Sequence, residues 1–385
     1  MMSPQRPIYL DYNATTPIDP AVKSAMLPWL QNHFGNPSSV HVYGKVVHQA
    51  VELARQQLAN LIGSDPSEIV FTGSGTEASN LAIKGSIWPR LLELSPRRSS
   101  QLQVIHSAIE HPATIKPCQW LAKFGCHIEV IPVDQFGILN LDKLRSALQR
   151  LTLLVSIMHS NNEVGTLQHV REIACMAHQA GALIHVDAAQ SLGKVSINVR
   201  EFDIDLMTIA GHKLYAPKGV GALFVRKGIQ LESVIHGAGQ EAGRRAGTEN
   251  VPYIVGLGQA AEIARQSLPS ATQHLQQLRD RLWNGLKERL EDIVQLNGHA
   301  NERLPNTLNI SVKGWFGSEL LTACPSIAAS TGSACHEGQV SISPVLAAMG
   351  IDSERAQGAV RLSVGRFTTE AEIDQAVDAI SQVVM

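Results

Sequence analysis

The sequence predicts an α/β fold, with a large domain built on a mostly parallel sheet and a smaller α+β domain. Two features of the chain support this prediction. Up to about Tyr253, short apolar runs of strand type alternate with helical patterns, and beyond it long amphipathic segments replace the alternation. Near-continuous apolar strands separated by helices are typical of parallel sheets that are covered on both faces.

The expected elements of the large domain follow one another in a regular order. Seven strand-like runs occur at residues 68–73, 102–108, 127–133, 151–160, 182–189, 205–211 and 219–226. Four helical patterns separate the first five runs, at residues 76–88, 113–125, 141–150 and 170–181. Because ligands of such sheets bind at the carboxyl ends of the strands, we expect a site in the loops at those ends.

The smaller domain is expected from the later segments. Helical patterns at residues 254–266 and 274–290 are followed by a strand-like run at 304–312, a Gly/Ser-rich stretch and a last patterned segment at 360–384. We therefore expect a large domain over residues 15–255 and a small domain made of residues 1–14 and 256–385, joined by one long helix. The N-terminal segment is expected to pack near the site of the large domain.

Composition narrows the classes of function. The 385 residues include 32 basic and 34 acidic side chains, which gives no reason to expect nucleic acid or an anionic membrane as partner. The longest apolar stretches, such as LTLLVSIM, are much shorter than the roughly 20 residues of a membrane span. The start, MMSPQRPIYLDY, lacks the apolar core of a signal peptide. The five cysteines show no CxxC spacing, so we expect neither a disulfide framework nor a metal site, and a reducing cytoplasm as the location.

The first candidate site is a turn of small residues in FTGSGTEASN. Gly73, Ser74, Gly75 and Thr76 lie between a predicted strand and a predicted helix. Small residues let backbone N–H groups approach an anion, and the start of a helix favours negative charge. Ser and Thr are also common helix caps, so the pattern alone fits either a phosphate site or an ordinary helix start.

Polar side chains stand at the ends of further strands. Asp187 follows a buried strand in ALIHVDAAQS, with Gln190 three residues on. Asn161 and Asn162 follow another in MHSNNEVGT, and His111 begins a helix in SAIEHPAT. A structural ion pair, turn chemistry and a capped helix with an exposed ring are the ordinary explanations. A cofactor ring offers another: a partner for the acid on its protonated nitrogen, hydrogen bonds for the amide and a stacking surface for the histidine.

A lysine stands where one of the buried strands ends. The run 205–211 is followed by His212 and Lys213. An isolated lysine is usually a solvated surface charge, whereas a desolvated one loses its proton and forms an imine with an aldehyde. A phosphate cradle, an acid for a ring nitrogen, an asparagine, a histidine and this lysine together describe a site for pyridoxal phosphate.

The last candidate is Cys335, in SIAASTGSACHEGQ. Its neighbours are Ala, Ser, Thr and Gly, although buried structural cysteines normally lie among large apolar side chains. An accessible loop is what a mobile nucleophile needs, and the adjacent His336 is a candidate to lower the pKa of the thiol. The spacing alone leaves a functional and a structural role equally open.

The motifs of the chain resemble those of the cysteine desulfurases, which are fold-type I, class V aminotransferase-like pyridoxal phosphate enzymes. The resemblance covers essentially the whole chain. In order along the chain, it is carried by IYLDYNATTP, FTGSGTEASNLAIKG, EHPA, NNEVGT, HVDAAQSLGK, AGHKLYAPKGVGAL, GAGQEAGRRAGTENV, LPNTLNIS, STGSAC and VRLSVGRFTTEAEID. It implies the fold of these enzymes, with a mostly parallel seven-stranded sheet.

The resemblance also implies how pyridoxal 5'-phosphate is held. Lys213 would bind the cofactor covalently through its amine. Gly75, Thr76 and His212 would hold the phosphate. Thr248 would reach that phosphate from the second subunit of a homodimer.

Further positions match cofactor contacts of the same family. Ala210 stands where many relatives have a serine that contacts the phosphate, so this contact would use only the backbone. Asp187 would pair with the ring nitrogen. Gln190 and Asn162 would bond the ring hydroxyl region, and His111 would stack on the ring.

The remaining matches concern the substrate and the reaction. Arg361 would bind the substrate carboxylate as a bidentate pair, assisted by Asn13 and Asn162; a surface ion pair is the commoner fate of an arginine. Lys213 would move the α-proton of L-cysteine, and the Cys335 thiolate would take its sulfur as a persulfide, releasing L-alanine. The expected partners are a second copy of the chain and a sulfur acceptor such as an iron–sulfur scaffold or a tRNA-thiolation protein.

The stretch after Cys335 departs from the pattern of many cysteine desulfurases of the housekeeping iron–sulfur type. The cysteine is followed by CHEGQVSISPVLAAMG, which is similar to the selenocysteine lyases and makes L-selenocysteine an alternative substrate. Another aminotransferase or lyase of the same fold would share Lys213 and Asp187 but would have no use for Cys335. A cofactor-free scaffold protein is the alternative from outside the enzymes.

Overall fold

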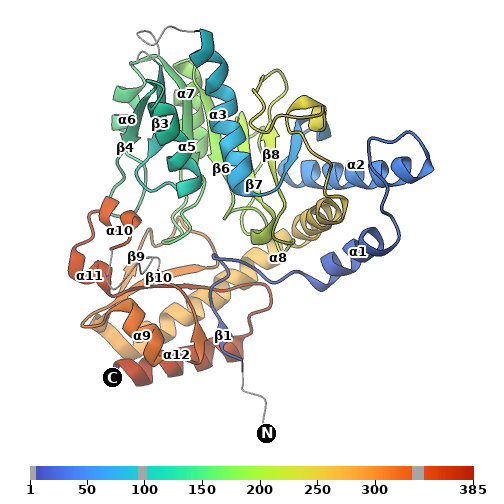
Figure 1. The fold of residues 1–385 in the computed structure, drawn as a ribbon. Helices are drawn as coiled ribbons and strands as arrows, with labels where there is room; N and C mark the ends of the chain where they lie inside the picture. The colour runs from blue at the N-terminus through green and yellow to red at the C-terminus, as the bar shows by residue number, and fades with distance from the viewer. Residues whose placement is uncertain (1–5, 94–101, 332–341) are drawn as a thin grey trace.

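The computed structural model describes residues 6–93, 102–331 and 342–385. A large sheet with helices on both faces forms one part of the molecule, and a small sheet backed by helices forms the other (Figure 1). A single long helix, α8 (Val251–Leu290), runs from one part to the other.

The large sheet has seven strands, in the order β2-β8-β7-β6-β5-β3-β4. Their bounds are β2 Ile69–Thr72, β3 Gln103–Ser107, β4 His127–Ile131, β5 Thr152–Met158, β6 Leu183–Asp187, β7 Leu206–Ala210 and β8 Gly221–Val225. Only β8 runs antiparallel to its neighbours, β2 and β7; all other pairs are parallel. The predicted α/β class with a mostly parallel seven-stranded sheet is therefore confirmed.

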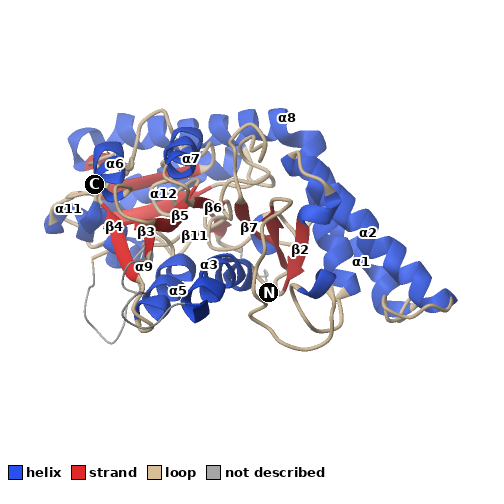
Figure 2. Cartoon of the chain, turned by 90° about the horizontal axis from the view of Figure 1, so that it is seen from above, coloured by secondary structure: helices blue, strands red, loops and turns tan. Residues whose placement is uncertain are grey.

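Helices cover the two faces of this sheet. The helices α3 (Gly75–Glu93) and α5 (Pro112–Ala122) cover one face, and α2 (Val42–Ile62), α6 (Leu141–Ala147), α7 (Val170–Gln179) and the first part of α8 cover the other (Figure 2). Residues of each strand alternate between the faces, so that Phe224 packs with the second group and Leu223 with the first. Burial on both faces explains why these strands are apolar almost throughout.

The smaller part is built on an antiparallel sheet of three strands, in the order β12-β10-β9. These are β9 Val294–Asn297, β10 Thr307–Val312 and β12 Ala359–Ser363. The second half of α8, together with α9 (Gly317–Ala323) and α12 (Glu370–Val384), packs on this sheet in a separate hydrophobic cluster. The short strands β1 (Ile8–Tyr9) and β11 (Ile327–Ala328) pair in parallel beside it. The remaining helices are α1 (Pro20–Gln31), α10 (Pro344–Ala348) and α11 (Ser353–Gln357).

The division into residues 15–255 and residues 1–14 with 256–385 stays a prediction. The helix α8 runs through its boundary: Val251 to Ala264 contribute to the cluster under the large sheet, and Leu275 to Leu290 to the cluster of the small one. The N-terminal segment follows the small sheet, where Ser363 N donates to the carbonyl oxygen of Leu10 at 2.7 Å. Within the described ranges, no helix is both long enough and apolar enough to cross a membrane.

Candidate active site

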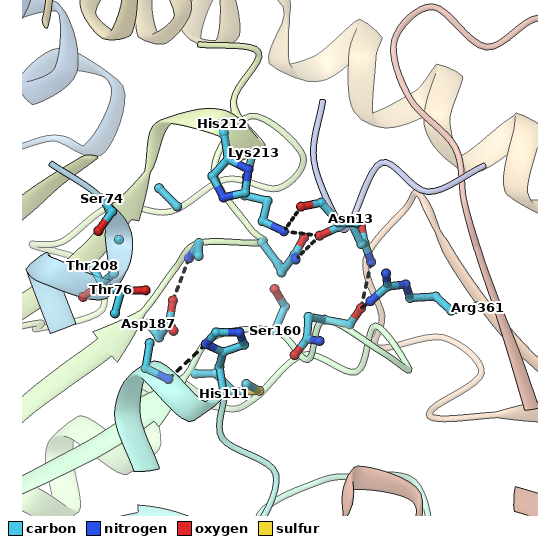
Figure 3. Close-up of a pocket in the computed structure, with 18 residues that line it drawn as sticks. Asn13, Ser74, Thr76, His111, Ser160, Asp187, Thr208, His212, Lys213 and Arg361 are labelled. Atoms are coloured by element: carbon cyan, nitrogen blue, oxygen red, sulfur yellow. Dashed lines mark hydrogen bonds between the residues drawn. The ribbon is translucent and has the colours of Figure 1, made fainter. Parts of the chain in front are cut away.

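A cavity of about 400 Å³ lies at the carboxyl ends of the parallel strands (Figure 3). The loops that follow β2, β3, β5, β6 and β7 line it, and the N-terminal segment and β12 close it from the side of the small sheet. It brings together eleven of the predicted site residues: Asn13, Gly75, Thr76, His111, Asn162, Asp187, Gln190, Ala210, His212, Lys213 and Arg361. These residues come from motifs that are far apart in the chain, and the fold brings them together in one cavity.

The start of α3 forms one end of the cavity. The first N–H groups of a helix have no partner within the helix, and the helix dipole adds positive potential there. Ser74 Oγ accepts from Glu77 N at 3.1 Å and holds the turn, while Gly75 begins the helix at the cavity. A Cβ on Gly75 would lie 3.0 Å from Ala210 Cβ, so a larger residue there would crowd the wall. This end has the features of an anion site.

Asp187 ends β6 at the floor of the cavity. Its Oδ1 accepts from Ala189 N at 3.0 Å. Burial raises the pKa of its carboxyl, and the backbone N–H of Ala189 and the nearby His111 and Lys213 work against this rise. A cationic ring nitrogen in the cavity would stabilise the charged carboxylate and so lower this pKa.

His111 is the N-cap of α5 and also lines the cavity. Its Nδ1 accepts from Ala113 N at 3.1 Å, which leaves the proton of a neutral ring on Nε2. Burial lowers the pKa of this imidazole, and so does Lys213, whereas Asp187 raises it. Figure 3 shows its ring at the edge of the cavity, close to Asp187. His111 is thus a helix cap, as the ordinary explanation of the sequence has it, and it also lines the cavity.

Lys213 ends the short helical turn Gly211–Lys213 that follows β7. Its amine donates to the carbonyl oxygens of Asn13 and, at 2.7 Å, Ala14. Burial and then the charge of Arg361 lower the pKa of this amine to about 8. Lys213 is therefore not a solvated surface charge; an appreciable fraction of it is uncharged near neutral pH, as a nucleophilic amine requires.

Its neighbour His212 sits on the same turn and is uncharged. Burial and the two lysines Lys213 and Lys218 lower the pKa of its ring to about 4. Its Nδ1 is 3.1 Å from Thr15 Oγ1, so it contacts the N-terminal segment.

Arg361 enters the cavity from β12 of the small sheet. Its Nη2 donates to Asp11 Oδ1 at 2.7 Å and its Nη1 to the carbonyl oxygen of Asn162 at 3.1 Å. Its Nε is buried and has no hydrogen-bond partner. Its guanidinium group lines the cavity, and its positive charge fits a carboxylate ligand.

Asn13 and Gln190 are held by hydrogen bonds within the protein. The Asn13 amide donates to Thr307 Oγ1 at 2.8 Å and to the Asn162 carbonyl at 3.1 Å. Gln190 Nε2 donates to the Asn13 carbonyl at 2.9 Å. A contact of Asn13 with a substrate would therefore cost one of its existing bonds.

Sequence reasoning missed several residues of the site. Ser160 and Thr208 line the cavity, Asp11 pairs with Arg361, Glu110 is buried and precedes His111 in the chain, and Lys194 donates to Asn13 and Gln190. Lys194 is the last residue of HVDAAQSLGK, and the resemblance to the cysteine desulfurases implies no role for it. No local pattern sets this lysine apart, because one of its partners, Asn13, lies far away in the chain.

Two predicted residues are not part of this cavity. Thr248 is exposed and lines a different surface pocket, together with Gly73 and Arg245. Cys335 lies outside the described residues, as does His336. Their predicted roles stay predictions.

The residues of the cavity fit pyridoxal phosphate. A helix start offers an anion site, Asp187 offers a buried carboxylate, Lys213 offers an amine of lowered pKa, and Arg361 offers a cation for the substrate carboxylate. In the described ranges, no cluster of three His, Cys, Asp or Glu side chains suited to a metal ion occurs.

Comparison with known proteins gives consistent matches over nearly the whole chain. The family model described as Aminotransferase class-V matches residues 8–376. Relatives named cysteine desulfurase, from Gluconacetobacter diazotrophicus and Nostoc sp., are 45% and 44% identical over 98% of this chain and over 93% and 92% of their own length. A solved NifS-like protein superposes with a TM-score of 0.90 at 35% identity, covering 98% of this chain and 99% of that one. A structure described as SspA in complex with cysteine gives a TM-score of 0.82 at 33% identity, covering 94% and 99%.

Proposed function

This chain belongs to the class-V aminotransferase family and, within it, to the cysteine desulfurases, and from that premise we propose that it converts L-cysteine to L-alanine and takes up the sulfur as a persulfide on Cys335. The observation that carries the proposal is the position of Lys213. Its amine, with a pKa of about 8, shares one cavity with the buried Asp187 and with Arg361.

Enzymes of this family depend on pyridoxal phosphate, and the cavity offers a place for each part of it. The start of α3 at Gly75 and Thr76 would hold the phosphate, Asp187 the ring nitrogen and Lys213 the aldehyde carbon. Bound there, the cofactor supplies an aldehyde for the substrate amine and a ring that takes up electrons from the substrate α-carbon.

The side chains of the cavity supply binding and proton transfer. Arg361, already held by Asp11 and the Asn162 carbonyl, binds the substrate carboxylate and orients the α-carbon toward Lys213. The uncharged amine of Lys213 accepts the α-proton. His111, whose neutral ring carries its proton on Nε2, would exchange a proton with the substrate thiol.

Sulfur transfer is the role of Cys335. Its thiolate attacks the sulfur of the substrate, the new S–S bond forms, and the bond from Cβ to sulfur breaks. The three-carbon remainder takes up protons and leaves as L-alanine. The persulfide then passes to an acceptor, for which we propose an iron–sulfur scaffold or a tRNA-thiolation protein in the cytoplasm.

Incubation of the purified protein with L-cysteine, with alanine and sulfide quantified, tests this function. We expect alanine release that Cys335→Ala abolishes, because no other group is assigned to accept the sulfur. Cys175, an exposed free cysteine, gives the matched control, since Cys175→Ala should keep the wild-type rate. Full alanine release by Cys335→Ala would refute the assignment of the nucleophile, and transfer of the amino group to a keto acid would favour an aminotransferase.

Selenocysteine is the second substrate to test, because the sequence after Cys335 is similar to that of selenocysteine lyases. A selenol is more acidic than a thiol and the C–Se bond is weaker than the C–S bond, so selenium elimination could proceed without Cys335. A wild-type protein that ignores L-cysteine but cleaves L-selenocysteine would be a lyase.

We further propose a homodimer in which Thr248 contacts the cofactor phosphate of the other subunit. Thr248 is exposed and does not line the cavity of its own chain. The segment between α1 and α2 exposes apolar side chains, including Phe34 at 83% and Val40 at 87%. Apolar side chains that gather on one exposed segment are typical of a subunit interface, and they support this arrangement.

A further inference from the structure

Lys194 is a buried lysine beside the cavity to which the proposed reaction gives no role. Only 5% of its surface is exposed. Its amine donates to Asn13 Oδ1 at 3.2 Å and to Gln190 Oε1 at 3.0 Å. Both acceptors are uncharged amide oxygens of cavity residues, so this lysine is not held there as half of an ion pair.

This amine orients the Gln190 amide and, together with Asn306 Nδ2 at 3.0 Å, the Asn13 amide. An amide has an oxygen end and a nitrogen end of nearly equal size, so its hydrogen-bond partners decide which end points where. Lys194 is a donor, and it therefore selects the oxygen ends of Asn13 and Gln190. Burial, together with the charges of Lys213 and Arg361, lowers the pKa of Lys194 well below its usual value.

The nitrogen ends consequently point toward the active groups. Gln190 Nε2 donates to the carbonyl oxygen of Asn13, which also accepts from Lys213 Nζ. Asn13 Nδ2 donates to the carbonyl oxygen of Asn162, which also accepts from Arg361 Nη1 at 3.1 Å. Figure 3 shows Asn13 between Lys213 and Arg361, linked by these bonds. The amine of Lys194 is thus linked through Asn13 and Gln190 to Lys213 at the cofactor end of the cavity and to Arg361 at the substrate end.

We propose that Lys194 is a positioning residue that fixes the side-chain amides of Asn13 and Gln190 and, through the carbonyl of Asn13, the amine of Lys213. The proposal rests on the proposed function, because it assigns Lys194 to the same pyridoxal phosphate site. Loss of the amine would leave the buried Gln190 Oε1 without a donor, and Asn13 Oδ1 would keep only Asn306 Nδ2, at 3.0 Å. The Gln190 amide would then be free to turn over, and the Asn13 amide would be held less firmly.

Replacement of Lys194 by methionine removes the amine and keeps the apolar stem. We expect Lys194→Met to weaken binding of pyridoxal 5'-phosphate to the apo-protein on the order of tenfold and to lower kcat by a similar factor. Titration of the apo-protein with the cofactor measures the first effect, and alanine release over a range of cysteine concentrations separates kcat from KM. Lys84→Met is the control, because Lys84 lies over the Trp120 ring, outside the cavity.

A double variant distinguishes positioning from packing. If Lys194 acts through Gln190, Lys194→Met/Gln190→Leu should bind the cofactor about as weakly as the weaker single variant. Losses that multiply would overturn the proposal, as would wild-type affinity and kcat in a Lys194→Met protein with a lowered unfolding midpoint. Should Lys194→Met not fold, Lys194→Gln, which keeps a donor, should retain most of the wild-type cofactor affinity, and a tenfold loss in that variant would overturn the proposal. A wild type that binds the cofactor but releases no alanine would refute the proposed function and leave the affinity test of Lys194 intact.

Discussion

Burial sets the protonation of the individual side chains that matter most here. It lowers the pKa of Lys213 to about 8 and raises that of the neighbouring buried acid Glu110 to about 8. It also keeps the rings of His111 and His212 uncharged near neutral pH. A cavity with few full charges is suited to a reaction that moves protons between carbon, nitrogen and sulfur.

The lowered pKa of Lys213 predicts how the apo-protein takes up its cofactor. Only the uncharged amine attacks an aldehyde, so the rate of covalent binding should rise about tenfold per pH unit below about 8 and level off above it. Stopped-flow absorbance after mixing with pyridoxal 5'-phosphate measures this rate. Lys213→Arg should show no covalent phase at any pH, and a wild-type rate that is the same at pH 6 and pH 9 would contradict the assignment, whose midpoint is about 8.

Glu110 predicts a pH dependence of stability. Its Oε1 accepts from Ser107 Oγ and Met158 N, and its Oε2 is buried without a partner. The folded protein keeps this carboxyl protonated up to about pH 8, whereas an unfolded chain releases the proton near pH 4.5. The folded state therefore binds more protons between these values, and stability falls as pH rises through them.

Glu110→Gln removes this titrating carboxyl and should remove the pH dependence of stability that the carboxyl causes. As pH rises from ~5 to ~8, the free energy of unfolding of Glu110→Gln should increase relative to that of the wild type. The increase should be at most about 1.4 kcal/mol per pH unit. Urea titrations at a series of pH values measure both proteins. Parallel curves for wild type and variant would show that Glu110 is already ionised in the folded state.

Motifs identified the residues that stand at strand ends, and they missed those whose role depends on distant partners. Lys213, Asp187 and His111 were predictable because each follows or precedes a recognisable element. Lys194 was not, because its partner Asn13 lies 181 positions away in the chain. Which side chains share a cavity depends on tertiary contacts that no local pattern contains.

Among the elements, the turn from β2 into α3 depends on how closely it packs against β8. A Cβ on Gly221 would lie 2.6 Å from the carbonyl carbon of Ser74 and 2.8 Å from Gly75 N. Contacts this short are not tolerated, so only glycine lets the strand pass beneath the candidate phosphate turn. The shape of the anion site is therefore set partly by a strand that contributes no side chain to it.

Gly221→Ala should displace this turn. We expect a loss of roughly 1–3 kcal/mol in the free energy of unfolding, together with weaker cofactor binding. Gly239→Ala is the matched control, because a Cβ there meets nothing within 4 Å. Urea denaturation and cofactor titration measure the two effects, and wild-type values for both in Gly221→Ala would disprove the packing argument.

Regular elements were predictable to the extent that their patterns are long and apolar. The helix expected at 141–150 ends at Ala147, and the strand expected at 304–312 begins at Thr307. The strand β9 was missed because VQLN is short and only partly buried, at the edge of its sheet. The strand order of the large sheet depends on long-range pairing and was outside the reach of local patterns.

In the whole molecule, the N-terminal segment ties the two parts together at the site. Asn13 bonds to Asn162 and Gln190 beside the large sheet and to Thr307 in the small one. Arg361, from the small sheet, reaches the same cavity. The site therefore needs both parts in place, and the proposed dimer adds a third contribution through Thr248.

That contribution can be tested by mixing two defective variants. Homodimers of Lys213→Ala lack the essential amine, and homodimers of Thr248→Val lack the phosphate contact at both sites. A mixed dimer regains one complete site, because the chain that keeps Lys213 receives Thr248 from its partner. Co-expression with two affinity tags isolates the mixed dimer, and we expect its rate to exceed that of either homodimer. A rate no higher than that of Thr248→Val would mean that Thr248 does not cross between subunits.

The covalent role of Lys213 is the central claim, and borohydride reduction of the cofactor-loaded protein followed by peptide mapping tests it most directly. The account predicts that the stable pyridoxyl group is found on Lys213 and that Lys213→Ala retains none. A group fixed on another lysine, or a wild-type protein that leaves Lys213 unmodified after loading and reduction, would contradict it.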